Sequence, residues 1–251
     1  MIVDYSLEYY QDILSQVVRW RAIPLNLLQE MSDYRGNKTS FYRVIRNLQD
    51  RQLIKATNFN GISKIVTPTP ELANLTSQRF NGFQEESLIH ESIITMLCFE
   101  ILTWEIFDFV RLPHEIIGEA YDSGIRRLPD AILEGKNQGK PFKMALEVEI
   151  TRKSKTRVQN KVEDYLRNDV FDFIFYVFND RPTFEAYKRF IYKTIQQPQF
   201  EQGRRSHEAR FILGYAPRMI GHKRKLQELE IFYLGKQTTL DSIFGKKRSD
   251  K

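Results

Sequence analysis

Apolar residues recur at helical spacing in three stretches of the first fifty residues. Side chains three or four positions apart lie on one face of a helix, so each stretch predicts a short helix with one buried face. The stretches are residues 7–18, 25–31 and 39–50. The apolar face of the third consists of Phe41, Val44, Ile45 and Leu48.

Two short strands are predicted to follow the third helix. Residues 53–57 and 63–66 form two runs that favour strands, and Asn58-Phe59-Asn60-Gly61 between them is a hairpin signal. Thr67-Pro68-Thr69-Pro70 ends the second strand, because proline cannot donate to a strand ladder. The first part of the chain is therefore expected to form helix, helix, helix and hairpin.

The solvent-facing side of the third helix is basic and rich in hydrogen-bond donors. Such side chains bind phosphates and the base edges of a DNA major groove. The candidate DNA-binding residues on this helix are Lys38, Thr39, Ser40, Tyr42, Arg43 and Arg46. Two alternatives stay open: a solvated helix face that happens to be basic, and a module that binds another protein.

Three helices followed by a two-stranded hairpin resemble a winged-helix domain. Residues 38–48 resemble the recognition helix of that family, and the stretch from Leu48 through Arg51-Gln52-Leu53-Ile54 resembles the junction into the wing. The resemblance covers residues 7–68. It implies an N-terminal DNA-binding domain, which we place at residues 1–82.

The pattern after residue 83 alternates between helical and strand periods. The order is helix, three strands, helix, strand, helix, strand, at residues 84–107, 107–117, 128–133, 144–150, 153–168, 171–178, 183–195 and 210–215. Residues 171–178 are almost continuously apolar, which is typical of a strand covered on both faces. We expect an α/β or α+β domain over residues 83–245, with helices packed on a mixed sheet. A basic tail, residues 246–251, is expected to be disordered.

Composition narrows the class of partner. The 251-residue chain has a formal net charge of +6 and a sequence pI of about 9.2, which favours a polyanion such as nucleic acid. Cys98 is its single cysteine, so a disulfide framework or a cysteine zinc site within one chain is excluded. No apolar run has the length of a signal peptide or a membrane span. We therefore expect a cytoplasmic protein without a membrane partner.

Candidate chemistry lies on two of the predicted strands. Side chains alternate along a strand, so Glu147 and Glu149 share one face, opposite Leu146, Val148 and Ile150. Asp130, on the preceding strand, is expected to face the two glutamates. Carboxylate oxygens are the ligands that Mg²⁺ or Mn²⁺ prefers, and such an ion polarises a phosphodiester and lowers the pKa of bound water.

Each of these acids also has a plainer interpretation. Glu147 and Glu149 could form a solvent-facing stripe on a half-exposed strand, and Asp130 could begin a turn. Glu91, on the preceding helix, is a candidate further metal ligand or an exposed acid near a helix start. The burial of these acids and the distances between them decide between these alternatives.

Pro129-Asp130, a hairpin and Glu147-x-Glu149 resemble the PD-(D/E)XK nuclease superfamily, whose core also runs helix, three strands, helix, strand. The resemblance covers about residues 85–216. It implies a restriction-endonuclease-like fold and Mg²⁺-dependent cleavage of DNA by Asp130, Glu147 and Glu149. The chain departs from the common motif, because Glu149 stands where the motif has lysine.

Related families supply that lysine from the following helix. Lys153, Lys155 and Lys161 are the candidates here, and Lys161 is preferred because it lies well inside the helix with Tyr165 one turn further on. Its role would be to orient the attacking water or to stabilise charge on the phosphate.

The order of the predicted domains and motifs resembles that of two smaller families. A winged helix, then Ile89-His90-Glu91, Pro129-Asp130, Glu147-x-Glu149 and a downstream lysine resemble MOBC-type mobilisation relaxases and the replication-relaxation proteins of plasmids. The first of these families implies nicking of one strand at a transfer origin, with accessory mobilisation proteins as further partners. The alternative is a catalytically inactive DNA-binding regulator of replication or transcription in a mobile element.

The sequence does not decide the function of several further basic and aromatic residues. The lysines and arginines from Arg152 to Arg157, with Lys153 and Lys155 among them, either follow the DNA backbone or form a solvated helix start. The basic runs at residues 222–225 and 246–248 carry the same two alternatives. Tyr121, Tyr165 and Tyr176 are candidates for a covalent nucleophile, and their spacing selects none of them.

Overall fold

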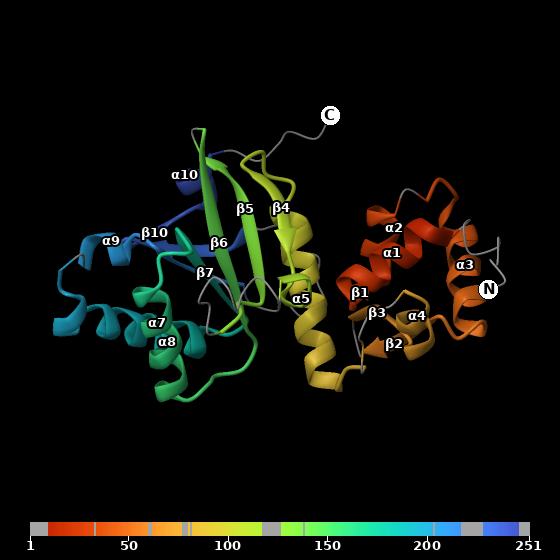
Figure 1. The fold of residues 1–251 in the computed structure, drawn as a ribbon, viewed down its shortest axis with the longest axis horizontal. Coiled ribbons are helices and arrows are strands. Elements are labelled where there is room, and N and C mark those ends of the chain that lie inside the picture. Colours follow the sequence, from red (N-terminus) through yellow and green to blue (C-terminus); the bar gives the residue numbers. More distant parts are fainter. Residues whose placement is uncertain are drawn as a thin grey trace. The chain divides into compact units, whose positions relative to one another are not determined.

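The computed structural model divides the chain into two compact units, Met1–Met96 and Leu97–Lys251 (Figure 1). The structure describes residues 10–32, 34–59, 62–76, 80, 82–116, 127–137, 139–202, 204–216 and 228–245. The predicted tail, residues 246–251, lies outside these ranges, as do residues 7–9 of the first predicted helix.

The N-terminal unit combines helices with a small antiparallel sheet. Its elements are α1 (Gln11–Trp20), β1 (Ile23–Pro24), α2 (Leu25–Met31), α3 (Lys38–Asp50), β2 (Ile54–Phe59), β3 (Ile62–Pro68), α4 (Pro70–Leu75) and the start of α5 (Glu85–Ile101). β3 pairs with β2 on one side and with the two-residue β1 on the other. The three predicted helices and both strands of the hairpin are present, whereas β1 and α4 were not expected. Asn60 and Gly61 of the predicted turn are not among the described residues.

α3 is an amphipathic helix with a defined start. Its four predicted apolar side chains are all buried, at about 1.5–3 kcal/mol for each fully buried side chain of this size. Asn37 caps the helix, because its side-chain oxygen accepts a hydrogen bond from the Ser40 amide at 2.9 Å. The buried face and the cap together fix which side of α3 meets solvent.

The N-terminal unit extends into α5. Leu88 packs with Ala22 and Ile65, and the Thr95 hydroxyl donates to the Ala22 carbonyl at 2.9 Å. The division between the two units therefore falls inside this helix, after Met96, whereas the sequence pattern had suggested residue 82.

The C-terminal unit is built on a mixed sheet, in which seven strands are seen within the described ranges. Its elements are the end of α5, β4 (Phe107–Arg111), β5 (Ala131–Asn137), β6 (Lys140–Glu149), α7 (Lys155–Arg167), β7 (Phe173–Phe178), α8 (Arg181–Ile195), η2 (Pro198–Phe200), α9 (Arg204–Glu208), β8 (Phe211–Tyr215), β9 (Glu230–Tyr233), β10 (Lys236–Thr238) and α10 (Leu240–Phe244). The strand order is β10-β9-β8-β7-β6-β5-β4. β6, β7 and β8 run parallel, and the other neighbouring pairs are antiparallel. The expected mixed α/β sheet with flanking helices is thus confirmed.

Some predicted boundaries were wrong. The helix expected over residues 84–107 ends at Ile101, and Phe107 instead opens β4 with its side chain buried. The turn expected at residues 134–140 is mostly strand, because Asn137 pairs directly with Lys140 across the hairpin. The polar residues of β5 resemble a loop in sequence although they occupy ladder positions.

Both faces of the central strands are covered. α7 and α8 pack on one face of the sheet (Figure 1), where their apolar side chains join Ala145, Tyr176 and Phe178 in one buried cluster. Leu146 and Val148 are buried on the opposite face of β6. Residues of β6 that alternate with Leu146 and Val148 therefore point toward α7 and α8 rather than toward solvent.

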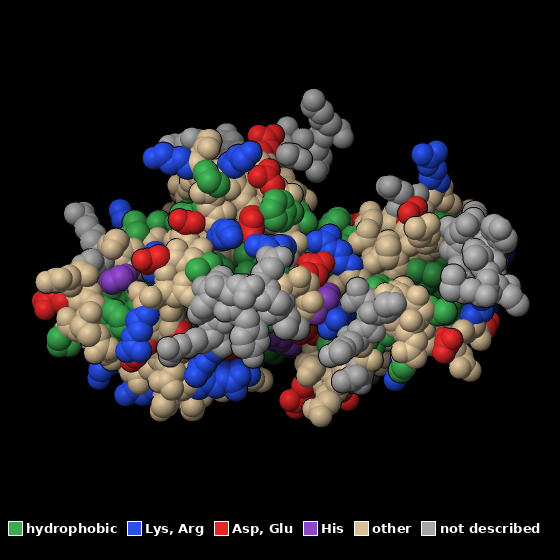
Figure 2. All heavy atoms as spheres, viewed as in Figure 1, with side chains coloured by type: hydrophobic (Ala, Val, Ile, Leu, Met, Phe, Trp, Pro, Cys, Tyr) green, Lys and Arg blue, Asp and Glu red, His purple; other side chains and the backbone are tan. Residues whose placement is uncertain are grey.

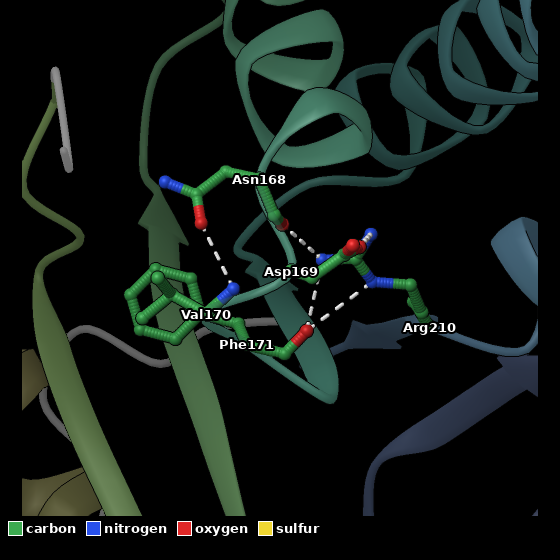
Figure 3. A network of polar contacts seen from close by, with 5 residues as sticks. All are labelled: Asn168, Asp169, Val170, Phe171 and Arg210. Atoms are coloured by element: carbon green, nitrogen blue, oxygen red, sulfur yellow. Dashed lines mark hydrogen bonds and ion pairs between the residues drawn. The ribbon is translucent and has the colours of Figure 1, made fainter. Parts of the chain in front are cut away.

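Arg210 holds the connection between α7 and β7 (Figure 3). Its Nη2 donates to the carbonyl oxygens of Asn168 at 2.6 Å and Phe171 at 2.9 Å. Its Nη1 lies 3.5 Å from Asp169 Oδ1. Because Arg210 directly precedes β8, this clamp ties the end of α7 to the sheet.

Candidate active site

Asp130 is fixed against β6 on both sides of Glu147. Its amide donates to the Leu146 carbonyl at 3.0 Å, and its Oδ2 accepts from the Val148 amide at 2.7 Å. The residue before β5 is therefore held beside the C-terminal part of β6, as the short hairpin predicted.

Glu147 is the buried centre of this site. Its side chain is 1% exposed, so a solvent-facing stripe is excluded for this residue. Oε2 accepts a hydrogen bond from Lys161 Nζ at 2.5 Å, and Oε1 accepts one from the Tyr165 hydroxyl. Lys161 and Tyr165 are one turn apart on α7, which lies over this face of β6. The lysine preferred from the sequence is the one placed on the acid.

Burial and neighbouring charges set the protonation of this pair. Burial raises the pKa of Glu147 to about 7, Lys161 opposes that shift, and Asp130 adds to it. Burial lowers the pKa of Lys161, but Glu147 and Asp130 together bring it above its ordinary value. Lys161 therefore keeps its proton, while Glu147 changes charge near neutral pH.

Glu149 differs from Glu147 in having a buried oxygen without a hydrogen bond in the described part of the chain. The residue is 7% exposed, and its Oε2 has no hydrogen-bond partner within the described part of the chain. The Tyr176 hydroxyl, also buried, likewise has none there. Burial raises the pKa of Glu149, and the nearby hydroxyl of Tyr187 acts against that shift. The Tyr187 hydroxyl on the same cavity wall is likewise without a hydrogen bond there, and since buried polar atoms are normally satisfied, these three unpaired atoms on one wall indicate a place for a ligand.

A cavity of about 250 Å³ opens onto Glu149. Its lining residues are Arg127, Leu128, Glu149, Lys153, Arg157, Val158, Lys161, Tyr176 and Tyr187. Four of these side chains are cations and one is an acid, so the cavity attracts anions. Lys and Arg side chains also gather around the segment that joins β6 to α7, at the lower edge of the view in Figure 2.

The structure separates the basic residues predicted near α7. Lys153 lines the cavity, whereas Arg152 lies 5.8 Å from the Phe190 ring centroid and Lys155 is exposed at the start of α7; neither lines the cavity. Arg157, the last of the basic residues predicted at this helix start, also lines the cavity, whereas sequence reasoning missed Arg127. Arg157 lies four residues before Lys161, on the same face of the helix.

The acids as they stand do not fit a metal ion. No three His, Cys, Asp or Glu side chains are grouped as ligands among the residues that the structure describes. Both Glu147 oxygens are engaged by Lys161 and Tyr165. Glu91 is on the N-terminal part of α5, with its Oε1 3.9 Å from His90 Nδ1. The expected hollow of three carboxylates is thus replaced by an ion pair, although hard oxygen donors are the right chemistry for Mg²⁺.

Tyr165 and Tyr176 are poor candidates for a covalent nucleophile. Both are buried, and burial together with Glu147 raises the pKa of each hydroxyl well above its ordinary value. A phenol that holds its proton so firmly is a weak nucleophile at neutral pH. Tyr121, the third candidate, lies outside the described residues.

The predicted basic face of α3 is exposed. Its solvent-facing side chains are Lys38, Thr39, Tyr42, Arg43 and Arg46. Ser40 is the exception among the predicted DNA contacts, since its hydroxyl donates to the Asn37 carbonyl at 2.8 Å at the helix start. Lys38 Nζ lies 6.0 Å from the Tyr42 ring centroid, so charge and aromatic surface are adjacent.

Comparisons with family models, with curated proteins and with solved structures find no match to this chain. In the described ranges, no helix has the length and apolar character that a membrane span needs.

Proposed function

We propose that this protein is a DNA endonuclease or nickase whose cleavage centre contains Asp130, Glu147, Glu149 and Lys161. The observation that carries the proposal is the 2.5 Å contact between Lys161 Nζ and the buried Glu147, beside a cavity lined by cations. A lysine ammonium is a compact positive charge that suits a phosphate. The buried acid holds that charge at the cavity wall, where it can stabilise the developing charge of a phosphodiester under attack.

The cations around the cavity are proposed to hold the DNA backbone. Lys153 and Arg157 line it together with Lys161, and Arg127 adds a fourth positive charge, which lies 3.4 Å from Asp164. Contacts with phosphates fix the position of a duplex without reading its sequence. Sequence-independent anchoring at the cavity leaves target choice to another part of the chain.

That part is proposed to be α3. The order of α1, α2, α3 and the β2–β3 hairpin supports a winged helix with α3 as the recognition helix. Arg43 and Arg46 on its exposed face are suited to phosphates and to guanine edges, and Thr39 and Tyr42 to further polar or thymine-methyl contacts.

The narrower proposal is a PD-(D/E)XK-like enzyme that nicks a plasmid or integrative-element transfer origin. The realised order of helix, three strands, helix and strand supports it, as does a lysine supplied by α7. The resemblance also implies Mg²⁺ or Mn²⁺ held by Asp130, Glu147 and Glu149, which would require Glu147 to give up its contacts with Lys161 and Tyr165.

A nicking assay on supercoiled plasmid tests the proposal. Wild-type protein with Mg²⁺ or Mn²⁺ is expected to convert supercoiled DNA to open circles, and EDTA to stop the reaction. Glu147→Ala is expected to be inactive. Lys188→Met is the matched control, because Lys188 lies on α8 outside the cavity and pairs with Glu185 at 3.9 Å. Intact DNA with wild-type protein, or full cleavage by Glu147→Ala, would contradict the proposal.

One observation favours a second function, a DNA-binding regulator without catalysis. Because both Glu147 oxygens are engaged, the site as it stands offers no group of ligands for an ion among the described residues. Such a regulator would protect DNA from a footprinting reagent while showing no divalent-dependent cleavage and no thermal shift with Mn²⁺.

A further inference from the structure

The four cations of the cavity beside β6 lie on its solvent side. Arg127 and Arg157 are exposed, whereas Lys153 and Lys161 are half-buried. Glu149 is the one acid among the described residues that line the cavity. Charge-assisted contacts with lysine and arginine favour an anionic group such as a phosphate. The anionic end of a ligand in this cavity is therefore expected near solvent.

The opposite wall of the cavity is buried and has unsatisfied polar atoms. Glu149, Tyr176 and Tyr187 line it with 7%, 0% and 1% of their surfaces exposed. Within the described part of the chain, Glu149 Oε2 and the two hydroxyls have no hydrogen-bond partner. A carboxylate oxygen accepts hydrogen bonds, whereas a phenol can also donate one. This wall suits a ligand group that carries a donor and an acceptor side by side, bound directly or through one water.

A nucleotide has both kinds of group at its two ends. A sulfate ion or a phosphodiester offers acceptors alone, so it suits the cations but brings no donor to Glu149 Oε2. The edge of a nucleotide base carries donors and acceptors together, and the sugar joins it to a phosphate. Leu128 and Val158, which also line the cavity, provide apolar surface for the face of a base.

The size of the cavity decides between one nucleotide and a duplex. A cube of about 250 Å³ has an edge of about 6 Å, which is about half the width of the major groove of B-DNA. A duplex is thus too wide to enter. A nucleotide can enter where it stands at a strand end or has been turned out of its pair.

We propose that the cavity receives a single unpaired nucleotide, with its phosphate at the four cations and its base edge at Glu149, Tyr176 and Tyr187. The inference deepens the proposed function and rests on it in one respect, that the nucleotide belongs to a DNA strand. The substrate class is then a strand end or a locally opened duplex rather than fully paired DNA.

Calorimetric titration without divalent cations tests the cavity apart from cleavage. The probes are the four deoxynucleoside 5′-monophosphates in turn, deoxyribose 5-phosphate and sulfate. We expect the best monophosphate to bind at least about tenfold more tightly than the other two probes, which is the effect of about one hydrogen bond to a charged group. Equal affinity for the monophosphates and for deoxyribose 5-phosphate would overturn the inference.

Phenylalanine variants isolate the buried wall. Tyr187→Phe is expected to bind the best monophosphate about fivefold more weakly, the size of one neutral hydrogen bond, and deoxyribose 5-phosphate as tightly as wild type. Tyr192→Phe is the matched control, because Tyr192 lies on the same helix with its ring 5.9 Å from that of Phe232, and it should bind both probes as wild type. Tyr176→Phe answers the same question if Tyr187→Phe does not fold. Unchanged monophosphate binding in both cavity variants would overturn the inference.

Displacement of the bound monophosphate identifies the source of the nucleotide. In equilibrium dialysis, a single-stranded oligonucleotide and a duplex with one unpaired base are expected to displace it. A relaxed, covalently closed plasmid at equal nucleotide concentration should displace little, although α3 could bind all three. Equal displacement by the closed plasmid would overturn the preference for unpaired DNA. Tight monophosphate binding that no DNA displaces would support a nucleotide site and contradict DNA as the substrate.

Discussion

The exposed face of α3 and the cavity beside β6 both present lysine and arginine, yet in opposite settings. Arg43 and Arg46 stand in solvent on an amphipathic helix, with no buried acid behind them in the described structure. Lys161 stands over Glu147, which is 1% exposed. Exposed charges are screened by salt, whereas a charge held on a buried acid keeps its position and its field. The first setting suits binding, and the second suits chemistry on what is bound.

The sharpest test of this contrast is to remove the ammonium at the cavity. Lys161→Met is expected to lower the single-turnover rate of DNA nicking by about 10²–10³-fold, the usual cost of losing one group that stabilises transition-state charge. DNA affinity measured by fluorescence anisotropy should change little. Arg46→Ala is the control from the other region and should show the reverse pattern. If Lys161→Met nicks DNA at the wild-type rate, the lysine at the cavity contributes no more to cleavage than the exposed cations of α3 do.

The buried acid predicts a pH dependence that α3 cannot produce. The pKa of Glu147 is about 7 in the folded chain and near 4.5 when unfolded, so between these values the folded protein binds the extra proton. Stability therefore falls as pH rises through this window, by on the order of 3 kcal/mol at about 1.4 kcal/mol per pKa unit. Below pH 4.5 both states are protonated and the contribution is constant.

Glu147→Gln isolates this contribution, because its amide does not titrate. The free energy of unfolding of wild type minus that of Glu147→Gln should decrease in urea titrations between pH 4.5 and about 7, the unfolded and folded pKa values, and level off at higher pH. A difference that stays flat or rises over that range would show that Glu147 is not held as a buried, partly protonated acid.

Removing positive charge from α3 should weaken DNA binding without changing the rate of nicking. Arg43→Ala with Arg46→Ala is expected to lower DNA affinity about tenfold at low salt, and to reduce the slope of log affinity against log salt by about 2, one for each phosphate that is no longer neutralised. Anisotropy at several salt concentrations measures both. Nicking at saturating protein should stay at the wild-type rate, and an unchanged salt slope would remove α3 from the DNA interface.

The smallest expected effect concerns the start of α3. Asn37→Ala removes the cap on the Ser40 amide and should lower the free energy of unfolding by about 1 kcal/mol. Asn37→Asp, which retains an acceptor, should be close to wild type. If alanine costs nothing in urea unfolding of the N-terminal unit, the cap does not contribute to ordering the basic face.

The sequence patterns correctly predicted which side chains share a face of a strand or helix, but they did not predict how deeply those faces are buried. Alternation along β6 correctly placed Glu147 and Glu149 on one side, and helical spacing placed Lys161 and Tyr165 together. Alternation does not say what covers a face, so the cover of α7 and α8 and the burial of Glu147 came only with the structure. The same applies to Arg127, which lies three residues before Asp130 and whose place on the cavity wall no spacing pattern indicates.

Short elements escaped prediction for a related reason. β9 and β10 carry few buried residues, and each is too short to show an alternating pattern. They pair with each other as a hairpin, and β9 also pairs with β8. The extension of β5 to Asn137 was hidden because exposed polar residues fill its alternate positions. Local periodicity identifies the long, half-buried elements and leaves the edges of the sheet to tertiary contacts.

The contacts of Arg210 constrain the length of the connection between α7 and β7 more than they constrain the types of side chain in it. Its two shortest bonds are to main-chain carbonyls, of Asn168 and Phe171, which every amino acid provides. Exchanging residues in this connection should therefore be tolerated more readily than adding one, because an inserted residue would carry a carbonyl out of reach of the guanidinium. A single-residue insertion between Asn168 and Phe171 would let the far end of α7 drift from the sheet, and the lysine at its middle would drift with it.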